Sequence, residues 1–227
     1  MRMRRKPNLE MRVDNCAHLL VSDPKSLKGR WRSEFKQEKL HIELGCGKGS
    51  FTVETAKTEP GVMHIALEKL TNILVLALEL ANREGAQNVR FINALADDLT
   101  EFFAPDEADR IYLNFCDPWP ARTHAKRRLT STRFLKLYGS VLRLDGEIHL
   151  KTDNLPFFEF SLRELESCGF LIIEETRDLH KNGQVGIMTD YELRFFNQGL
   201  PIYKCIARSV GDAALGVPRE RFSHEIS

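Results

Sequence analysis

Short apolar runs alternate with amphipathic stretches along most of the chain. The apolar runs are typical of strands buried on both faces of a parallel sheet, and they lie at Leu40–Leu44, Val62–Glu68, Val89–Asn93, Arg110–Phe115, Glu147–Lys151 and Phe170–Glu174. The stretches between them have helical spacing and lie at Ser50–Lys57, Leu70–Arg83, Thr130–Leu142 and Pro156–Cys168. Strands that alternate with helices at this pitch predict βαβ units, and hence an α/β fold with a doubly wound sheet.

The two ends of the chain lack this alternation. Residues 1–35 begin with a basic arm and continue as a polar, weakly periodic segment that is compatible with short helices. The last elements of the pattern are a loop at Gly183 and Gly186, a polar helix near Tyr191–Asn197 and a strand near Ile202–Ala207. We therefore predict one α/β domain over residues 36–208, preceded by an N-terminal extension and followed by a polar tail at 209–227.

The composition is that of an ordinary globular protein. Of 227 residues, 42% are hydrophobic and 29% are charged, which excludes a disordered or fibrous chain. The 33 Lys and Arg residues nearly balance the 32 Asp and Glu residues, so the net charge is only +1. This balance excludes a uniformly basic coat, and any surface that binds nucleic acid must be local.

The lack of a recognisable targeting signal and the scattered cysteines predict a cytoplasmic protein. No apolar run approaches the ~18 residues that a membrane-spanning helix needs, and no apolar segment follows the basic start as it would in a secretory signal. The cysteines are scattered without a Cys-x-x-Cys pair, at Cys16, Cys46, Cys116, Cys168 and Cys205. We expect them to be reduced, with no disulfide framework and no metal site.

A glycine-rich loop follows the first predicted strand. Gly45, Gly47 and Gly49 would let the backbone pass close to a ligand. Glu68 ends the next strand, where a carboxylate can accept hydrogen bonds from both ribose hydroxyls of an adenosine. The spacing is G-x-G-x-G rather than G-x-G-x-x-G, and Glu43 precedes the first glycine. A carboxylate there would repel a pyrophosphate but attract the cationic end of S-adenosylmethionine, so charge favours the methyl donor over a dinucleotide.

The third predicted strand ends among polar residues. Asn93, Asp97 and Asp98 could each meet the adenine amino group of the donor. The two aspartates fit the acidic first turn of a helix equally well, because carboxylates are favoured at helix N-termini. The residues by themselves leave this choice open.

The fourth predicted strand runs into a turn that contains Asp117, Pro118, Trp119 and Pro120. The two prolines stiffen the turn, and Asp117 stands at the carboxyl edge of the sheet, where such folds bind ligands. A carboxylate beside an aromatic ring suits a nucleobase, because the acid accepts from N–H groups while the ring stacks. In isolation, a turn initiated by Asp-Pro with a packed Trp would be the simpler interpretation.

Four Lys or Arg residues and one His fall within the eight residues 121–128. Such a run is usually a solvated loop. Because this run directly follows the predicted base pocket in a nearly neutral protein, we expect it to hold phosphates of a nucleic acid. The N-terminal arm could strengthen that contact with Arg2, Arg4, Arg5 and Lys6.

Six motifs span about residues 1–207, and they are the Met-Arg-x-Arg start, Glu43–Gly49, Tyr112–Pro120, Lys126–Thr130, His149–Asn154 and Met188–Glu192. In this order they resemble the motifs of the bacterial tRNA (guanine-N7)-methyltransferases, the TrmB group. The resemblance implies a Rossmann-like class I methyltransferase with a seven-stranded sheet, mostly parallel with one antiparallel strand, and helices on both faces. It also implies S-adenosylmethionine as the cofactor and tRNA as the partner, with 7-methylguanosine formed at position 46 of the variable loop.

Together with the residue arguments above, the resemblance assigns roles to single positions. Asp117 is implied as the catalytic residue, and the implied donor contacts are Glu43, Gly45, Gly47, Glu68, Asn93, Leu95 and Asp117. The implied substrate contacts are Ala121, Thr123, His124, Lys126, Arg127, Arg128, Asp153, Thr189, Asp190, Tyr191 and Glu192. We expect no membrane and no metal as partner, and either a monomer or a homodimer.

Three positions depart from the family pattern. The third acidic donor contact falls on Leu95, so either its backbone serves or Asn93 or Asp97 replaces it. Lysine usually follows Asp-Pro-Trp-Pro, where this chain has Ala121. The family's Thr-Glu-Tyr-Glu has Asp190 as its second residue here, a milder change.

Other functions compete with this interpretation. Methyltransferases that act on amino groups of adenine or glutamine have an Asn/Asp-Pro-Pro-aromatic turn that resembles the turn at Asp117. A non-catalytic RNA-binding subunit could keep the same fold, but the intact Glu43, Gly45 and Glu68 argue against loss of the donor site. A nicotinamide dehydrogenase is the weakest alternative, because no Tyr-x-x-x-Lys pair lies near the sheet edge.

Overall fold

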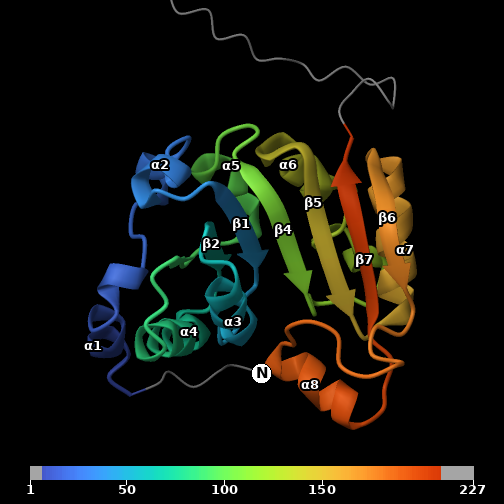
Figure 1. The fold of residues 1–227 in the computed structure, drawn as a ribbon. Coiled ribbons are helices and arrows are strands. Elements are labelled where there is room, and N and C mark those ends of the chain that lie inside the picture. Colours follow the sequence, from blue (N-terminus) through green and yellow to red (C-terminus); the bar gives the residue numbers. More distant parts are fainter. Residues whose placement is uncertain (1–6, 211–227) are drawn as a thin grey trace, which may run out of the picture.

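The computed structural model describes residues 7–210 of the chain. One sheet holds seven strands in the order β3-β2-β1-β4-β5-β7-β6 (Figure 1). The strands are β1 (Lys39–Leu44), β2 (Val62–Leu67), β3 (Val89–Ile92), β4 (Ala108–Asn114), β5 (Leu142–Thr152), β6 (Phe170–Thr176) and β7 (Tyr203–Ser209). All six predicted strand runs and the predicted last strand are present, and the α/β fold with a seven-stranded sheet is confirmed. The run at Phe170–Glu174 was predicted to be a buried parallel strand, but β6 is an edge strand that pairs antiparallel with β7 and is largely exposed.

Strand β1 lies at the centre of the parallel part of the sheet. It pairs with β2 on one side and with β4 on the other, and β3 and β5 continue the sheet in parallel. Strand β7 runs antiparallel to both of its neighbours, β5 and β6. The chain order reverses between β1 and β4, and open α/β sheets bind ligands beside such a switch point, at the carboxyl ends of the strands. The loops after β1 and β4 therefore position the site.

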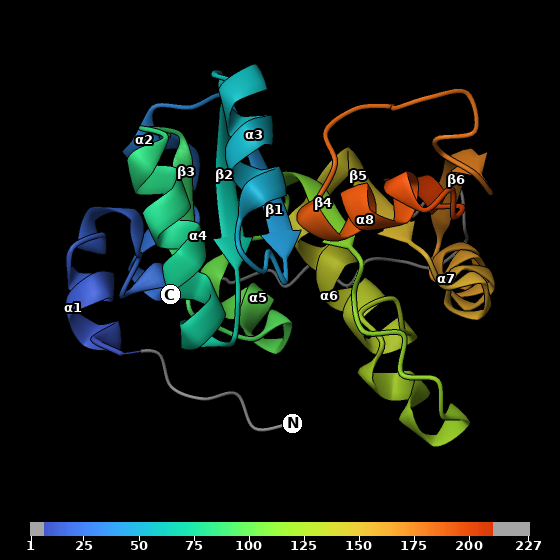
Figure 2. The ribbon, with the colours of Figure 1, turned by 90° about the horizontal axis from the view of Figure 1, so that it is seen from below.

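Helices cover both faces of the sheet (Figures 1 and 2). The α-helices of the described residues are α1 (Leu9–Asp14), α2 (Trp31–Phe35), α3 (Ser50–Thr58), α4 (Thr71–Arg83), α5 (Leu99–Phe102), α6 (Thr132–Val141), α7 (Leu155–Ser167) and α8 (Asp190–Asn197). Helices α5, α6 and α7 bury their apolar side chains in the larger core on one face. Helices α3 and α4 bury theirs in a smaller core on the other face. Helix α8 lies beyond the carboxyl ends of β4 and β5 (Figure 1).

The two faces of the central strands differ in character. Ile42, Ile111 and Ile148 point into the larger core on the side of α5, α6 and α7. Because successive side chains of a strand point to opposite faces, their neighbours lie on the face that α3 partly covers. That second face is polar in its middle, and its side chains there are His41, Glu43, His64, Arg110, Tyr112, Asn114, His149 and Lys151.

Some elements differ from the predicted pattern. Strand β5 begins at Leu142, well before the predicted Glu147, and passes through Asp145 in a left-handed conformation with a φ of 62°. Polar residues at this irregular start interrupt the apolar pattern, so the sequence does not predict the first part of the strand. Helix α5 has four residues and was not predicted, because so short a helix leaves no apolar periodicity.

Part of the predicted N-terminal extension packs against the sheet. Trp31 of α2 is fully buried, stacks on Phe103 at 5.3 Å and donates from Nε1 to the carbonyl of Phe102 at 2.9 Å. Leu20 forms a parallel bridge with Phe91 of the edge strand β3. The basic arm at 1–6 and the tail at 211–227 lie outside the described residues. No helix among those described is long and apolar enough to cross a membrane.

Candidate active site at the carboxyl edge of the sheet

The loop between β1 and α3 passes three times through left-handed backbone conformations. Gly45, Gly47 and Gly49 have φ angles of 79°, 58° and 78°, which glycine adopts without strain. A Cβ atom on Gly49 would lie 2.7 Å from the Cβ atom of Ala77, so glycine also allows α3 and α4 to pack closely. Nothing lies within 4 Å of the Cβ positions of Gly45 and Gly47. That side of the loop is open to a ligand.

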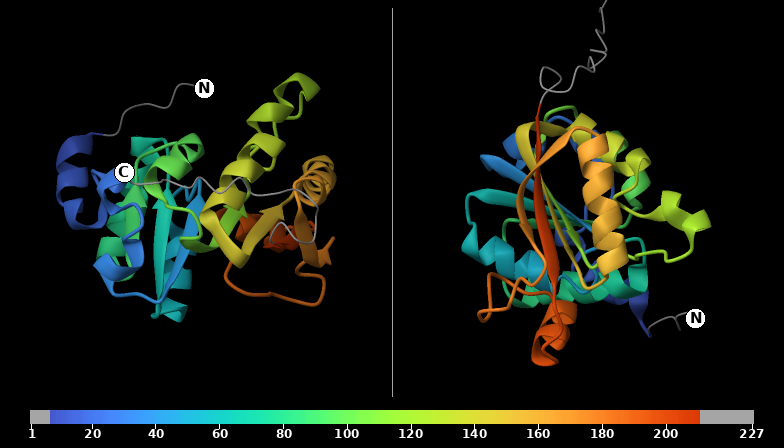
Figure 3. Two further views of the ribbon diagram at one scale, coloured as in Figure 1. Left: turned by 90° about the horizontal axis from the view of Figure 1, so that it is seen from above. Right: turned by 90° about the vertical axis from the view of Figure 1, so that its right-hand side faces the viewer.

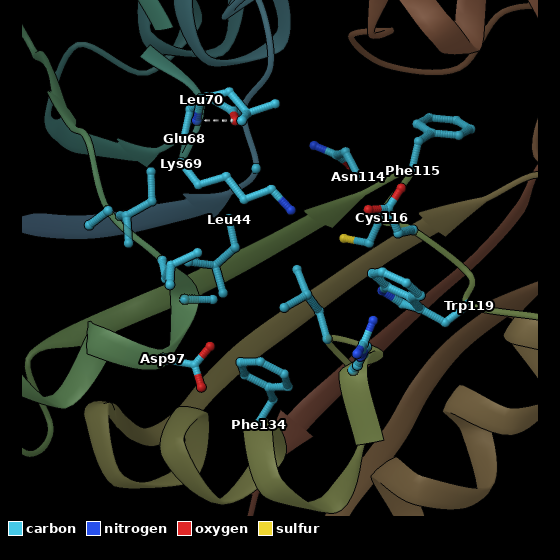
Figure 4. A pocket seen from close by; sticks show the side chains of 18 residues that line it. Leu44, Glu68, Lys69, Leu70, Asp97, Asn114, Phe115, Cys116, Trp119 and Phe134 are labelled. Atoms are coloured by element: carbon cyan, nitrogen blue, oxygen red, sulfur yellow. Dashed lines mark hydrogen bonds between the residues drawn. The ribbon is translucent and has the colours of Figure 1, made fainter. Parts of the chain in front are cut away.

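The carboxylate of Glu68, at the end of β2, is fixed by two backbone N–H groups. The amide of Gly47 donates to Oε2 at 3.2 Å, and the amide of Leu70 donates to Oε1 at 2.9 Å (Figure 4). Glu68 is 8% exposed. Each oxygen keeps a further lone pair, so the carboxylate is oriented and can still accept from ligand hydroxyls.

A cavity of about 350 Å³, the first cavity, opens beside Glu68 between the ends of β1, β2 and β4 (Figure 4). This volume lies within the range of small-molecule sites. Leu70, Leu95 and Phe134 provide apolar walls, and Asp97 and Asp117 contribute carboxylates. The first cavity therefore offers flat apolar surface for a base beside a fixed acceptor for a sugar.

Asn93 does not line the first cavity, unlike Leu95 and Asp97. Its Nδ2 donates to the carbonyl of Glu68 at 2.8 Å, and its Oδ1 accepts from the hydroxyl of Thr71 at 2.8 Å. The side chain of Asn93 thus joins β3 to the start of α4, and both of its polar groups are already used. Of the predicted adenine contacts, Leu95 and Asp97 line the cavity. The backbone amide of Leu95 donates to Oδ2 of Asp98 at 3.3 Å, and Asp97 forms an ion pair with Arg133.

A second cavity of about 270 Å³ shares Gly45, Asn114 and Phe115 with the first. Glu43 lines it and accepts hydrogen bonds from the hydroxyl of Thr52 and from Nδ2 of Asn114, the latter at 2.9 Å. Burial raises the pKa of Glu43, and the two hydrogen bonds act against that rise. Asn114 was not among the predicted site residues. Its position at the carboxyl end of β4 is the feature of the sequence that could have indicated it.

The turn after β4 places Asp117 at the wall of the first cavity. Phe115 and Trp119 flank it with positive φ angles of 51° and 42°. Arg128 holds the turn, because its Nε donates to the carbonyl of Pro118 at 2.9 Å and its Nη2 donates to that of Trp119 at 3.0 Å. Asp117 is exposed, and its carboxylate accepts no hydrogen bond from residues 7–210. It is available to a ligand.

The basic segment predicted to contact phosphates forms a 3-10 helix at Arg122–Arg127 that projects from the body of the molecule (Figure 3). The guanidinium of Arg127 lies 5.0 Å from the centre of the Trp119 ring, and His124 meets the same ring edge-on at 5.7 Å. Ala121, Thr123, Lys126 and Arg127 are exposed. Arg128 differs from these residues, because it is half-buried and turned back onto the chain.

The segment that contains Thr189 begins helix α8. The hydroxyl of Thr189 accepts from the amide of Glu192 at 2.9 Å, and Oε2 of Glu192 accepts from the amide of Thr189 at 3.2 Å, forming a capping box. Glu192 has no exposed surface, so this predicted substrate contact is not accessible to a substrate. Asp190 and Tyr191, in contrast, are exposed and line the second cavity.

Glu192 is held by two further side chains. Nζ of Lys151 lies 3.0 Å from both of its oxygens, and Nε2 of His180 lies 2.9 Å from Oε1. Lys151 also donates to the carbonyl of Ile187 at 3.0 Å. Desolvation lowers the pKa of Lys151, and Glu192 acts against that shift. These contacts anchor the loop before α8 to strand β5. His180 was not among the predicted site residues, because no motif in the sequence around it marks it as functional.

Asp153, directly after β5, is half-buried and lies beside Tyr191. Burial, followed by the charge of Asp153, raises the pKa of Tyr191. Asp153 therefore belongs to the same edge of the sheet as the second cavity. Arg194 of α8 also lines that cavity, and the sequence offered nothing to distinguish it from other exposed basic residues.

Comparisons with known proteins agree with this arrangement. A family model described as a putative methyltransferase matches residues 37–205. A tRNA (guanine-N(7)-)-methyltransferase of Geobacillus kaustophilus is 46% identical over 91% of this chain and 96% of its own length. The enzyme of that name from Geobacillus thermodenitrificans is also 46% identical, over 91% and 97% of the two chains.

Solved structures show the fold. The 16S rRNA methyltransferase KamB superposes with a TM-score of 0.61 and 12% identity, covering 79% of this chain and 92% of its own. A 16S rRNA (adenine(1408)-N(1))-methyltransferase from Catenulisporales acidiphilia, solved with its cosubstrate, has a TM-score of 0.59 and 14% identity, covering 88% and 95%. The motifs, the seven-stranded sheet and the extended identity place this chain in the family of tRNA (guanine-N7-)-methyltransferases, whose donor is S-adenosylmethionine.

Proposed function

We propose that the protein transfers the methyl group of S-adenosylmethionine to N7 of guanosine 46 in the variable loop of tRNA. The observation that carries this proposal is the meeting of the two cavities at Gly45, Asn114 and Phe115, with Asp117 at the wall of the first. A donor that spans both cavities would have its sulfonium centre near their junction. A base beside Asp117 and Trp119 would then face that junction.

The residues of both cavities fit the donor. Glu68 has two oriented oxygens for the ribose hydroxyls, and the open side of Gly45 and Gly47 admits the sugar and the chain of the donor. Leu95 or Asp97 would meet the adenine. Glu43 would hold the cationic amino group, which offsets the burial of its carboxylate. When bound, the donor supplies an electrophilic methyl group.

The acceptor nitrogen needs no deprotonation, because N7 of guanine has an in-plane lone pair and no proton. The task of the protein is to align N7 with the methyl group at roughly 3–3.5 Å. We propose that Asp117 accepts hydrogen bonds from the Watson–Crick edge of the guanine and offsets the positive charge that grows on the ring. The base would have to leave its stack in the tRNA to reach this site.

The remaining predicted residues divide into contact and positioning roles. We infer that the projecting segment contacts the tRNA, through the backbone of Ala121 and the side chains of Thr123, His124, Lys126 and Arg127. We also infer that the base approaches the site past Asp153, Asp190 and Tyr191. Arg128, Thr189 and Glu192 would act indirectly, by holding the turn of Asp117 and the start of α8. A local basic surface agrees with a net charge of +1, because only the projecting segment needs to meet phosphates.

The decisive experiment is incubation of the protein with labelled S-adenosylmethionine and unmodified bulk tRNA, followed by mapping of the modified base. We expect label in alkali-sensitive 7-methylguanosine at position 46. Label in an exocyclic amino group would favour the competing amino-group methyltransferase. No label with normal tRNA binding would favour a non-catalytic subunit. We further propose that the enzyme is cytoplasmic and acts as a monomer or a homodimer. Analytical ultracentrifugation can distinguish the monomer from the homodimer.

A further inference from the structure

His41 and His64 stand side by side on the polar face of the sheet, away from both cavities. They are register partners on the parallel strands β1 and β2. Both are buried, with 4% and 3% of their surface exposed, and their rings lie 5.3 Å apart and nearly perpendicular. Glu59, in the turn between α3 and β2, directs its carboxylate at both rings.

Three polar atoms in this cluster are buried and lack a hydrogen-bond partner among the described residues. Oε2 of Glu59 lies 3.2 Å from Nδ1 of His41 and 3.3 Å from Nε2 of His64. None of the three atoms takes part in a hydrogen bond among the described residues. Buried polar atoms without a partner are uncommon in folded proteins, and a bound ion is one of the explanations for them. Both ring nitrogens lie within ion-pair distance of the same oxygen of Glu59, without hydrogen-bond geometry to it.

Two of the three distances between these atoms match the edge of a tetrahedral metal centre. Zinc binds imidazole nitrogen and carboxylate oxygen at about 2.0–2.2 Å, so two ligand atoms on one edge of its tetrahedron lie about 3.3 Å apart. The two nitrogen–oxygen distances have this length, and all three atoms lie within 4.8 Å of one another. We propose that His41, Glu59 and His64 bind one zinc ion, with water in the fourth position.

The surroundings allow an ion to enter and to be held. The side chain of Glu59 is 31% exposed, which gives the site a path to solvent. Arg110 is a nearby cation, with Nη1 3.9 Å from the other oxygen of Glu59, but its Nη2 donates to Glu147 at 3.1 Å. Glu147 therefore gives Arg110 a carboxylate partner other than Glu59 when Glu59 binds the ion.

The place of the cluster in the fold points to a structural role. A zinc ion would join β1, β2 and the turn after α3. None of the three ligands lines the first or the second cavity. The ion would stabilise this half of the sheet and take no part in methyl transfer. This inference stands apart from the proposed function, because zinc binding can be measured without tRNA or methyl donor.

The test uses the full chain, stripped of metal with a chelator and titrated with zinc chloride by calorimetry. We expect one zinc ion per chain with a dissociation constant at or below about 1 μM, and a melting temperature that rises with zinc concentration. Cobalt(II) in place of zinc should give the visible absorption bands of a tetrahedral centre. Absence of binding would overturn the proposal and leave a cluster bridged only by water.

Three variants make the assignment specific. Glu59→Gln and His64→Gln each remove one ligand and should weaken zinc binding at least about 100-fold, whereas His18→Gln removes an exposed histidine and should leave it unchanged. Circular dichroism checks that each variant folds. If His64→Gln does not fold, Glu59→Gln decides, because Glu59 is partly exposed. Equal affinity in Glu59→Gln and the unaltered protein would show an adventitious ion only and overturn the proposal.

Discussion

The ammonium group of Lys151 lies 3.0 Å from both carboxylate oxygens of Glu192, and the Glu192 side chain has no exposed surface. This pair joins β5, near the middle of the sheet, to α8, whose first turn lines the second cavity. Glu192 also accepts from the amide of Thr189. One buried carboxylate therefore fixes both the start of α8 and its distance from the sheet.

Lys151→Met should destabilise the protein strongly, because it leaves the buried charge of Glu192 without its cation. Removing one partner of a buried ion pair typically costs about 3–5 kcal/mol of unfolding free energy, measured here by urea denaturation. Lys204→Met is the matched control, because its ion pair with the half-exposed Glu174 lies at the surface and should contribute less than about 1 kcal/mol. Equal losses in the two variants would contradict the anchoring role of Lys151.

Glu68→Gln should weaken binding of S-adenosylmethionine by about 1–3 kcal/mol. The substitution keeps one oxygen acceptor but replaces the other with an amide donor, which cannot accept from a ribose hydroxyl. Calorimetry on the variant measures the affinity, and Glu101→Gln, at an exposed position paired with Lys25, serves as the control. Unchanged donor affinity in a folded Glu68→Gln variant would remove this residue from the donor site.

Arg127 and Arg128 are adjacent in the sequence, but their substitutions should have different effects. Arg127→Ala removes an exposed guanidinium and should reduce the salt dependence of tRNA binding by about 0.9 for each phosphate that the variant no longer neutralises. Arg128→Ala removes the hydrogen bonds from the guanidinium to the carbonyls of Pro118 and Trp119 and should lower turnover while the salt dependence stays nearly constant. Filter binding over a series of salt concentrations and single-turnover kinetics distinguish the two. Identical profiles would show that Arg128 also contacts phosphate.

Acid should destabilise the protein partly through His149. Burial, followed by the charge of Arg110, lowers the pKa of His149 from 6.5 to about 4 in the folded state. Between pH 6.5 and about 4, His149 is therefore protonated in the unfolded chain but neutral in the folded protein. Its contribution to the free energy of unfolding is complete above about pH 6.5 and is lost as the pH falls toward 4. In His149→Gln, the slope of unfolding free energy against pH in this window should be shallower by up to about 1.4 kcal/mol per pH unit. Parallel slopes would show that His149 does not titrate there.

The sequence predicts the parallel part of the fold well, because each buried strand and each amphipathic helix has its own local signature. Leu40–Leu44 and the spacing of Gly45, Gly47 and Glu68 indicate the switch-point loop without any tertiary information. Strand β5 begins earlier than predicted, since residues near Asp145 are polar and irregular. Short elements such as α5 depend on their packing and leave no periodic pattern.

The candidate site shows a similar division. Residues of one loop, such as Gly47 or Asp117, could be selected from local motifs. Contacts between distant segments could not, and His180 reaches Glu192 only because the loop before α8 folds back over β5. The same limit applies to the cluster of His41, Glu59 and His64, which lies on two strands and a turn and has no sequential metal-binding spacing.

Asp117 is the position at which the proposed chemistry can be tested most directly. Its carboxylate is exposed at the wall of the first cavity and accepts no hydrogen bond from the described residues. Asp117→Asn keeps the size and the turn, which Arg128 holds through the carbonyls of Pro118 and Trp119, but it removes the negative charge. Any change in rate therefore reports the charge and not the shape of the turn.

We expect single-turnover rates of Asp117→Asn to fall by about 10²–10³, the usual loss when one electrostatic contact to a developing charge is removed. Affinity for tRNA should change little, because the exposed cations of the projecting segment, among them Arg127, are retained. The unaltered enzyme should form 7-methylguanosine, whose fixed positive charge makes the ring open in alkali, whereas a methylated amino group would be stable there. Full activity in Asp117→Asn would remove the carboxylate from the chemical step. An alkali-stable product would instead overturn N7 as the acceptor, so the two measurements test the residue and the reaction separately.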